Sequence, residues 1–297
     1  MKIVISIFCL PHEIDDLEQV LLELKKGAPY LSGKTQWVMD VTVCDADDMV
    51  DWKKSSLPKS YFFDKLARMY AFTDWCSKHF QTSSAIKGSL AQKRYSLERN
   101  SDADYFIWLD SDIVFDHRTL SYIEKWIYEL HEENPLFFMT PEIVRWWDTT
   151  WDCLVNEQFL QKPLGYQATN DPFVDCGIKG EVSPEIVVNN IPNQPRFKFG
   201  SGIFLCISRG LMKRIGIPAS FGQYGLEDTF MMFAADKLSN EGKEVIFQFK
   251  LKNLVVCENY RYRRHNHYLN HLSVFNRKEE FKKISQQNFD AEVSRII

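Results

Sequence analysis

Five apolar residues, Tyr105 to Leu109, lead directly into two acids, Asp110 and Asp112, which are separated by one residue. Such a run is typical of a strand buried on both faces, as in a parallel sheet that is covered by helices. A buried strand does not carry two carboxylates unless a partner compensates their charge. We therefore expect the strand to end at this acid pair, with both carboxylates at the open edge of a sheet.

Strand-like and helical segments alternate over residues 1–116, which predicts an α/β fold with a mostly parallel central sheet and helices on both faces. Ligands of such sheets bind at the carboxyl ends of the strands, where Asp45 falls as well as the acid pair. The other expected elements are strands at Lys2 to Cys9 and Gln36 to Cys44, and helices at Ile14 to Lys26, Phe63 to Phe80 and Lys87 to Arg99.

The pattern is less regular from residue 117 onward. Residues 141–198 are rich in Trp, Asn, Pro and Gly and show little periodicity, which predicts a long binding loop or lid. No linker divides the chain, so we expect one domain over residues 1–297. The elements expected in this half are helices at 120–130, 211–215, 228–238 and 276–293, a strand at 203–207, and one or two strands at 245–256.

The composition narrows the class of protein. The net charge of −4 argues against a protein that coats nucleic acid. The seven cysteines are odd in number and scattered, which is typical of reduced core cysteines in a cytosolic protein. The apolar N-terminal run is short for a signal peptide, and no run approaches the roughly 20 apolar residues of a membrane span. We therefore expect a soluble cytoplasmic protein.

Two carboxylates one residue apart at a strand end form a compact oxygen site. Such a site suits a hard divalent cation, Mn²⁺ or Mg²⁺, that retains open positions for phosphate oxygens. Two solvated loop acids would give the same pattern by chance. The apolar strand in front of Asp110 favours the metal site, because it holds the acids at the mouth of the sheet.

A second group of residues lies between Phe199 and Met232. Glu227 and Asp228 begin an apolar helix there, where acids also stabilise a helix N-terminus with no further role. The preceding turn, "FGQYG", combines glycines with aromatic rings, including Tyr224. This composition favours a pocket with a flat face on which a ring can stack. Gly200 and Gly202 permit a close approach of the backbone.

A third group lies in the basic segment "CENYRYRRHNHYLNH". His265 and His267 are two residues apart, so they share one face of an extended strand, and one imidazole could complete the shell of a cation. The neighbouring arginines, among them Arg264, could hold a diphosphate. Solvated surface histidines and arginines are the alternative interpretation.

In this order, the three groups resemble the GT-A class of metal-dependent, nucleotide-sugar glycosyltransferases. The "LDSD" that ends at Asp112 resembles the D-x-D motif of that class. "GSLAQKR", Gly88 to Arg94, resembles the A-R-N-like helix of family 2, and Arg94 precedes Asp110 by 16 residues (110 − 94) as it does there. Asp45 matches the family 2 acid that faces the nucleotide base.

The second half resembles family 7, the β-1,4-galactosyltransferase-like enzymes. "FGSG", "LMKRIGIP" and "GQYGLED" stand for the F-G-G, G-F and G-W-G-G-E-D elements of that family. Asp228 then matches the catalytic base, Glu227 its acceptor-contacting neighbour, and Tyr224 the Trp under the acceptor sugar. "RRH" places the metal-ligand histidine on His265. The turn departs from the family sequence, so sugar selectivity does not carry over.

The resemblance implies an inverting transfer of a sugar from a nucleotide-diphosphate sugar to an acceptor hydroxyl, with Mn²⁺ or Mg²⁺ as cofactor. A UDP-sugar is the first candidate for the donor. Residues 1–116 would bind the donor and residues 117–297 the acceptor, with Asp228 and Glu227 as catalytic residues. The remaining implied site residues are Asp45, Gly88, Arg94, Asp110, Asp112 and Arg264 for the donor, Gly202, Tyr224 and Trp147 (with Trp146 or Trp151) for the acceptor, and Asp112, Asp110 and His265, or His267 instead, for the metal.

Several alternatives remain open. The acceptor can be a glycan, a lipid-linked sugar, a protein side chain or a hydroxylated base of viral or phage DNA, and the D-x-D pair also serves retaining enzymes. By resemblance Asp112 ligates the metal directly, while Asp110 reaches the ribose or acts through water. A nucleotidyltransferase would use the same acids, but the "FCLPHEIDD" that follows the first strand offers no Gly-rich phosphate loop and no signature Lys. A GT-A fold that binds a nucleotide sugar without catalysis is the non-enzymatic alternative.

Overall fold

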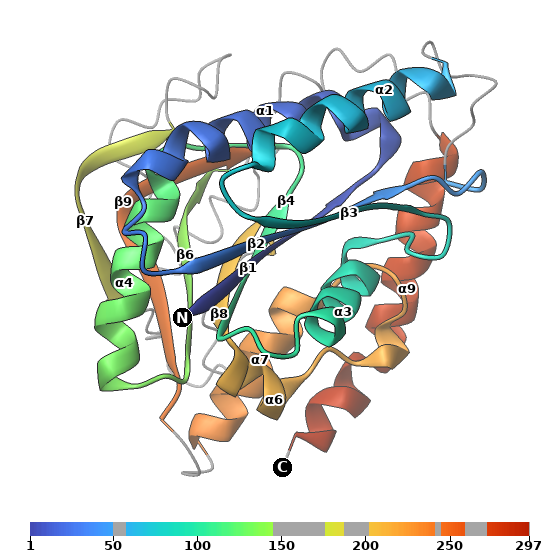
Figure 1. The fold of residues 1–297 in the computed structure, drawn as a ribbon. Helices are drawn as coiled ribbons and strands as arrows, with labels where there is room; N and C mark the ends of the chain where they lie inside the picture. The colour runs from blue at the N-terminus through green and yellow to red at the C-terminus, as the bar shows by residue number, and fades with distance from the viewer. Residues whose placement is uncertain (50–57, 145–175, 187–201, 241–244, 259–271, 297) are drawn as a thin grey trace.

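The computed structural model describes residues 1–49, 58–144, 176–186, 202–240, 245–258 and 272–296. Within these residues nine strands form one sheet, in the order β3-β2-β1-β4-β8-β6-β9-β5, with β7 paired to β9 (Figure 1). The strands are β1 Lys2–Cys9, β2 Gln36–Cys44, β3 Ser77–Ser83, β4 Tyr105–Asp110, β5 Ile113–Val114, β6 Phe137–Val144, β7 Gly177–Ile186, β8 Phe204–Ser208 and β9 Phe247–Glu258.

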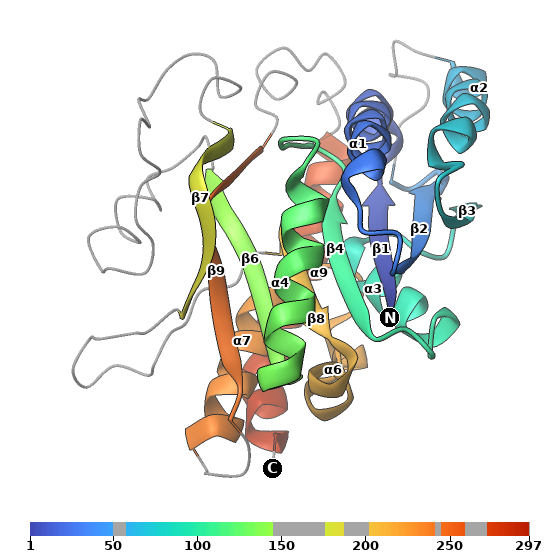
Figure 2. The same ribbon diagram turned by 60° about the vertical axis from the view of Figure 1, so that its left-hand side comes forward.

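Helices cover both faces of this sheet (Figure 2). The α-helices are α1 Ile14–Gly27, α2 Lys59–Met69, α3 Ser89–Arg99, α4 Thr119–Glu133, α6 Arg209–Ile215, α7 Glu227–Asn240 and α9 Leu272–Arg295. Short 3-10 turns lie at η1 Pro11–Glu13, η2 Ala28–Tyr30, η3 Tyr70–Thr73 and η5 Ala219–Phe221.

The N-terminal part of the sheet is parallel. β1 lies between β2 and β4, and β3 extends the sheet beyond β2, all in parallel register. β1 places Phe8 beside Asp110 on one side and beside Thr42 on the other, so β1, β2 and β4 end at the same edge. The α/β class predicted from the sequence is confirmed. β8 then pairs antiparallel with β4 and β6, and β9 pairs parallel with β6.

The side chains of β4 alternate between two cores, as the two-residue period of a strand requires. Tyr105 and Ile107 pack with α1 and α4 on one face of the sheet. Phe106 and Trp108 pack with α3, α6 and α7 on the opposite face. Because both faces are covered, the strand is apolar throughout, and its first carboxylate appears only at its end.

One prediction from the sequence is wrong. The helix predicted at Phe63 to Phe80 ends at Met69, and β3 follows at Ser77–Ser83 as a largely polar strand beyond β2. The apolar residues of Phe72 to Trp75, which suggested a longer helix, pack beside the core from the 3-10 turn and the connection after it. Most of the irregular stretch predicted for 141–198 lies outside the described residues, so the predicted loop or lid stays a prediction. In its described parts, β6 continues to Val144, and β7 pairs antiparallel with β9.

Helix α3 is fixed on the sheet by a buried polar network. Asp40 on β2 is fully buried, and its carboxylate accepts hydrogen bonds from Asn100 Nδ2 at 2.9 Å and from Gln92 Nε2 at 3.3 Å. A buried carboxylate is tolerated where such donors satisfy it. The network therefore sets how α3 lies over β2. Within the described part of the chain, no helix combines the length and apolar content that crossing a membrane requires.

Candidate active site

The predicted acid pair lies at the carboxyl edge of the parallel strands. Asp110 is the last residue of β4, and its backbone amide donates to the carbonyl of Ile203 at 2.9 Å. Between the two acids, Ser111 is buried and its Oγ donates to Glu13 Oε2 at 2.9 Å. The same Glu13 oxygen accepts from the Leu10 amide at 2.9 Å, so the end of β1 holds the D-S-D turn in place.

Negative charge accumulates at this turn. Burial and the neighbouring carboxylate of Asp112 raise the pKa of Asp110 from 3.8 to about 7, and Glu13 and Glu227 add to the rise while Lys93 opposes it. A carboxylate in this state is stabilised by added positive charge. An oxygen-rich, acidic donor set fits Mn²⁺ or Mg²⁺.

The described residues contain no complete metal site. In that part of the chain, no cluster of three His, Cys, Asp or Glu side chains is placed to hold an ion. The predicted third ligands, His265 and His267, lie outside the described residues, as do Arg264, Trp146, Trp147 and Trp151.

Glu227 and Asp228 begin α7, as predicted, and the backbone before them is strained. Gly225 and Leu226 both have positive φ, 97° and 64°, and Leu226 carries a side chain that disfavours this region. Asp228 Oδ2 accepts from the Gly202 amide at 3.1 Å, and its Oδ1 accepts from the Thr229 amide at 2.7 Å. The strained turn thus presents a carboxylate whose two oxygens are both oriented.

Gly202 connects the two pairs of acids. A Cβ atom at this position would lie 3.3 Å from Glu227 Oε1 and 3.4 Å from Asp228 Oδ2, so both carboxylates converge on its α-carbon. The next residue, Ile203, accepts the hydrogen bond from the Asp110 amide. One dipeptide therefore contacts both the end of β4 and the start of α7, and the acceptor-binding role assigned to Gly202 stays a prediction.

Lys93 lies between these groups and was not predicted as a site residue. Its Nζ pairs with Glu227 Oε1, and both side chains are buried. It also lies 5.0 Å from the ring centroid of Trp108, two residues before Asp110. A lysine in a helix is normally solvated at the protein surface. Lys93 is buried because α3 packs against α7, which a local sequence pattern does not indicate.

The N-terminus of α3 packs directly on the turn before α7. A Cβ at Gly88 would lie 2.2 Å from the Gln223 carbonyl oxygen, which also accepts from the Leu90 amide at 3.1 Å. Arg94 donates to the carbonyls of Pro218, at 3.1 Å, and of Gly222. These contacts show how Gly88 and Arg94 support the turn, and the donor-binding role assigned to both stays a prediction.

The C-terminal helix holds the same turn from the other side. Ser285 Oγ on α9 lies 2.9 Å from the Phe221 carbonyl and 2.8 Å from the Tyr224 carbonyl. The ring of Tyr224 packs against the cluster that includes Phe281 of α9 and Leu10 after β1. Tyr224 therefore lies near the end of β1, and its role as a platform for the acceptor stays a prediction.

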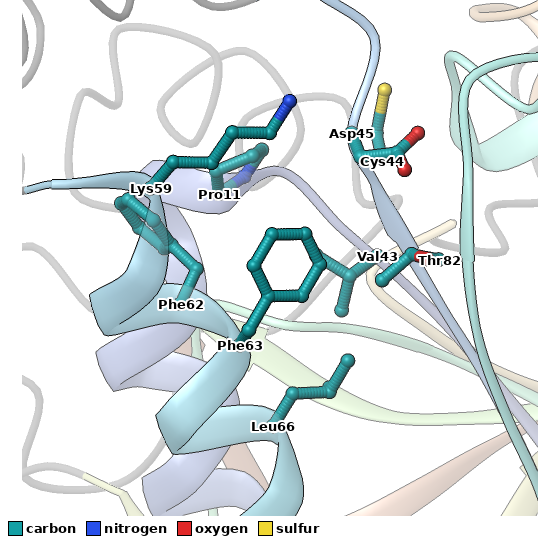
Figure 3. Close-up of a pocket in the computed structure, with 9 residues that line it drawn as sticks. All are labelled: Pro11, Val43, Cys44, Asp45, Lys59, Phe62, Phe63, Leu66 and Thr82. Carbon is teal, nitrogen blue, oxygen red and sulfur yellow. The ribbon is translucent and has the colours of Figure 1, made fainter.

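A small pocket opens beside Asp45, at the carboxyl end of β2. Figure 3 shows Phe63 of α2 facing Val43 and Thr82 across this pocket, with Asp45 at the end of its strand. Asp45 Oδ1 is buried and has no hydrogen-bond partner within the described part of the chain. A buried carboxylate oxygen without a donor fits a ligand that brings an N–H group. The other lining residues are Pro11, Cys44, Lys59, Phe62 and Leu66.

Comparisons with known proteins give similarity of fold at low sequence identity. A scan against models of known families finds no match, and a search of curated proteins finds none. The chain is similar to the mannosyltransferase PcManGT from Pyrobaculum calidifontis in complex with GDP-Man and Mn²⁺, with 12% identity and a TM-score of 0.49 over 98% of this chain and 68% of that one.

Two further solved structures are similar at the same level. Glucosyl-3-phosphoglycerate synthase from Mycobacterium tuberculosis, in complex with Mn²⁺, UDP-glucose and glycerol 3-phosphate, has 14% identity and a TM-score of 0.43 over 92% of this chain and 77% of that one. A UDP-glucose pyrophosphorylase complexed with UDP-glucose has 12% identity and a TM-score of 0.40 over 85% and 92%. Neither the reaction nor the substrate of this chain follows from similarities at this level.

Proposed function

We propose that this protein is a glycosyltransferase of the GT-A type, which moves a sugar from a nucleoside diphosphate sugar to an acceptor hydroxyl. The observation that carries the proposal is that one dipeptide, Gly202 and Ile203, is hydrogen-bonded both to the backbone amide of Asp110 and to the carboxylate of Asp228. It brings a candidate metal and diphosphate site on Asp110 and Asp112 next to a candidate base, Asp228. This is the arrangement that transfer between a charged donor and a neutral hydroxyl needs.

The donor would bind along the carboxyl edge of β2 and β4. The pocket beside Asp45 takes the base, and the Asp45 oxygen, which has no donor among the described residues, accepts a ring N–H, which uracil and guanine have and cytosine lacks. Uracil is the smaller of the two, and the family resemblance also favours it, so a UDP-sugar is the first candidate. Asp110 and Asp112, with His265 or His267, would hold Mn²⁺ or Mg²⁺, which when bound neutralises charge on the diphosphate leaving group.

The chain's own residues would carry the proton transfer. Asp228 accepts the proton of the acceptor hydroxyl while that oxygen bonds to the anomeric carbon and the bond from this carbon to the diphosphate oxygen breaks. The nucleoside diphosphate leaves with the electron pair of the broken bond. Glu227 orients the acceptor, and Tyr224 with Trp147 would contact it. Attack from the face opposite the leaving group inverts the configuration.

The direct test is release of the nucleotide from a panel of sugar donors, which is UDP from UDP-sugars, GDP from GDP-sugars and CMP from CMP-sugars, with Mn²⁺, with Mg²⁺ and with EDTA. Water replaces the unidentified acceptor in this assay. We expect metal-dependent release from a UDP-sugar, slower or absent release from GDP-sugars, and none from CMP-sugars. A full panel without metal-dependent release would contradict sugar transfer, while formation of pyrophosphate and a UDP-sugar from UTP and a sugar 1-phosphate would indicate nucleotidyl transfer.

A further inference from the structure

The ammonium group of Lys93 is buried between the two acid groups of the candidate active site. Lys93 Nζ pairs with Glu227 Oε1, and the two side chains are only 5% and 8% exposed. The ring of Trp108 closes another side of the ammonium group, at 5.0 Å from its centroid. Lys93 comes from α3, Glu227 from α7 and Trp108 from β4, so the contact joins three elements.

This buried charge is held by carboxylates on both sides. Burial alone would lower the pKa of Lys93, but Glu227, followed by Asp110 and Asp228, outweighs it and raises the pKa above the ordinary value of 10.5. The lysine is therefore an ammonium at any physiological pH. Burying a charged pair costs more free energy than packing apolar side chains of equal volume, so stability alone is a weak reason for this pair.

The position of Lys93 bears on Asp228 through Glu227. The carboxylates of Glu227 and Asp228 converge on Gly202, where a Cβ would lie 3.3 Å and 3.4 Å from them. Two negative charges at such range repel each other, which disfavours this arrangement of the carboxylates unless a cation lies beside them. A cation on Glu227 removes this repulsion and fixes the carboxylate in one orientation.

We propose that Lys93 is a positioning residue of the transfer reaction, which holds Glu227 in place for the acceptor and leaves Asp228 free to act as the base. This inference rests on the proposed function. Lys93 touches neither the donor nor the reacting atoms in this account and acts through Glu227. A residue that only fastens α3 to α7 would contribute to stability and to nucleotide binding without a selective effect on turnover.

The test uses four variants of the full-length chain. Lys93→Met removes the charge of the lysine and keeps its volume, and Lys93→Arg keeps the charge. Glu227→Gln removes the charge of the partner, and the double variant Lys93→Met/Glu227→Gln removes both charges. Lys250→Met is the matched control, because Lys250 pairs with Glu142 at 3.3 Å and both side chains are similarly buried. Each protein is assayed for kcat and KM of UDP release from the UDP-sugar that the wild type turns over with Mn²⁺, for calorimetric binding of UDP with Mn²⁺, and for its thermal midpoint.

We expect Lys93→Met to lower kcat about 100-fold while the Kd for UDP with Mn²⁺ changes less than about threefold. Lys93→Arg should recover at least about tenfold of that loss, and the double variant should be no slower than Glu227→Gln alone, because the lysine acts only through the glutamate. Lys250→Met should lower the thermal midpoint and leave kcat unchanged. If Lys93→Met fails to fold, the arginine and double variants still decide.

Three results would overturn the inference. The first is that Lys93→Met has the kcat of the wild type. The second is that Lys93→Met loses affinity for UDP by the same factor by which it loses kcat. The third is that the double variant is slower than Glu227→Gln by the full factor that Lys93→Met costs in the wild type. They differ from failure of the proposed function, in which the wild type itself releases no nucleoside diphosphate from any donor. That result would remove the proposed function and this inference together.

Discussion

The amide of Gly202 donates a hydrogen bond to Asp228 Oδ2 at 3.1 Å, so the proposed base is oriented by the backbone of a different element. The second oxygen, Oδ1, accepts from the Thr229 amide at 2.7 Å. Asparagine at position 228 has the same shape and still offers an oxygen to one of these amides, but it cannot take up a proton at neutral pH. This substitution therefore separates the chemistry of Asp228 from its place in the fold.

We predict that Asp228→Asn lowers turnover of the UDP-sugar about 10²- to 10⁴-fold, the usual contribution of a general base. The Kd for UDP with Mn²⁺ should stay within about threefold of the wild-type value, and the variant should remain folded at 25 °C. Steady-state kinetics measure the turnover, and calorimetry measures the Kd. Asp290→Asn, an exposed residue of α9, is the matched control. Turnover within about tenfold of the wild type would remove Asp228 as the base.

A second prediction concerns Asp45, whose buried Oδ1 has no donor in the described part of the chain. Asp45→Ala should weaken binding of UDP with Mn²⁺ about tenfold, the loss expected for one hydrogen bond to a charged group. Asp47→Ala is the control, because the Asp47 side chain lies in the same segment but is 83% exposed. Calorimetry on both variants decides, and equal affinities would place the base elsewhere.

Sequence reasoning located the acid groups because each is tied to a local pattern. The strand that ends at Asp110 is apolar on both faces, and the edge at which parallel strands end follows from topology. Asp228 begins an apolar helix after a turn rich in glycine, which is also a local signal. The bounds of β1, β2 and α3 were predicted to within a few residues for the same reason.

The remaining features depend on contacts between distant parts of the chain. Lys93 and Glu227 are 134 residues apart in sequence, and no local pattern marks a lysine in a polar helix as buried. The predicted helix extends into the first residues of β3, because a polar strand beside β2 lacks a continuous apolar run. β7 likewise has no local signal, since it lies in a stretch with little periodicity and pairs, within the described residues, with the distant β9.

A third prediction concerns the packing of α3 on the turn before α7. Gly88→Ala places a methyl group 2.2 Å from the backbone oxygen of Gln223, and a backbone atom cannot move aside without shifting the turn. We expect a loss of about 1–3 kcal/mol in the free energy of unfolding, as for overpacked sites. Chemical denaturation measures it, with the exposed Ser84→Ala as control. An unchanged free energy of unfolding would mean that α3 is not held against the turn.

The last prediction is a pH dependence of stability in the metal-free protein. Burial and the charge of Asp112 raise the pKa of Asp110 from 3.8 to about 7, so between these values the folded state binds a proton that the unfolded state has released. The stability that this group contributes is complete below about pH 4 and is lost as the pH rises toward 7. The slope is at most about 1.4 kcal/mol per pH unit.

We expect the free energy of unfolding of the wild type, measured in EDTA by urea denaturation from pH 4.5 to 7.5, to fall relative to that of Asp110→Asn. Saturating Mn²⁺ should flatten the difference, because a bound cation favours the ionised carboxylate. Parallel curves for the two proteins in EDTA would show that the pKa of Asp110 is not raised in the folded protein. The D-S-D turn would then hold no carboxylate repulsion that a bound cation could offset.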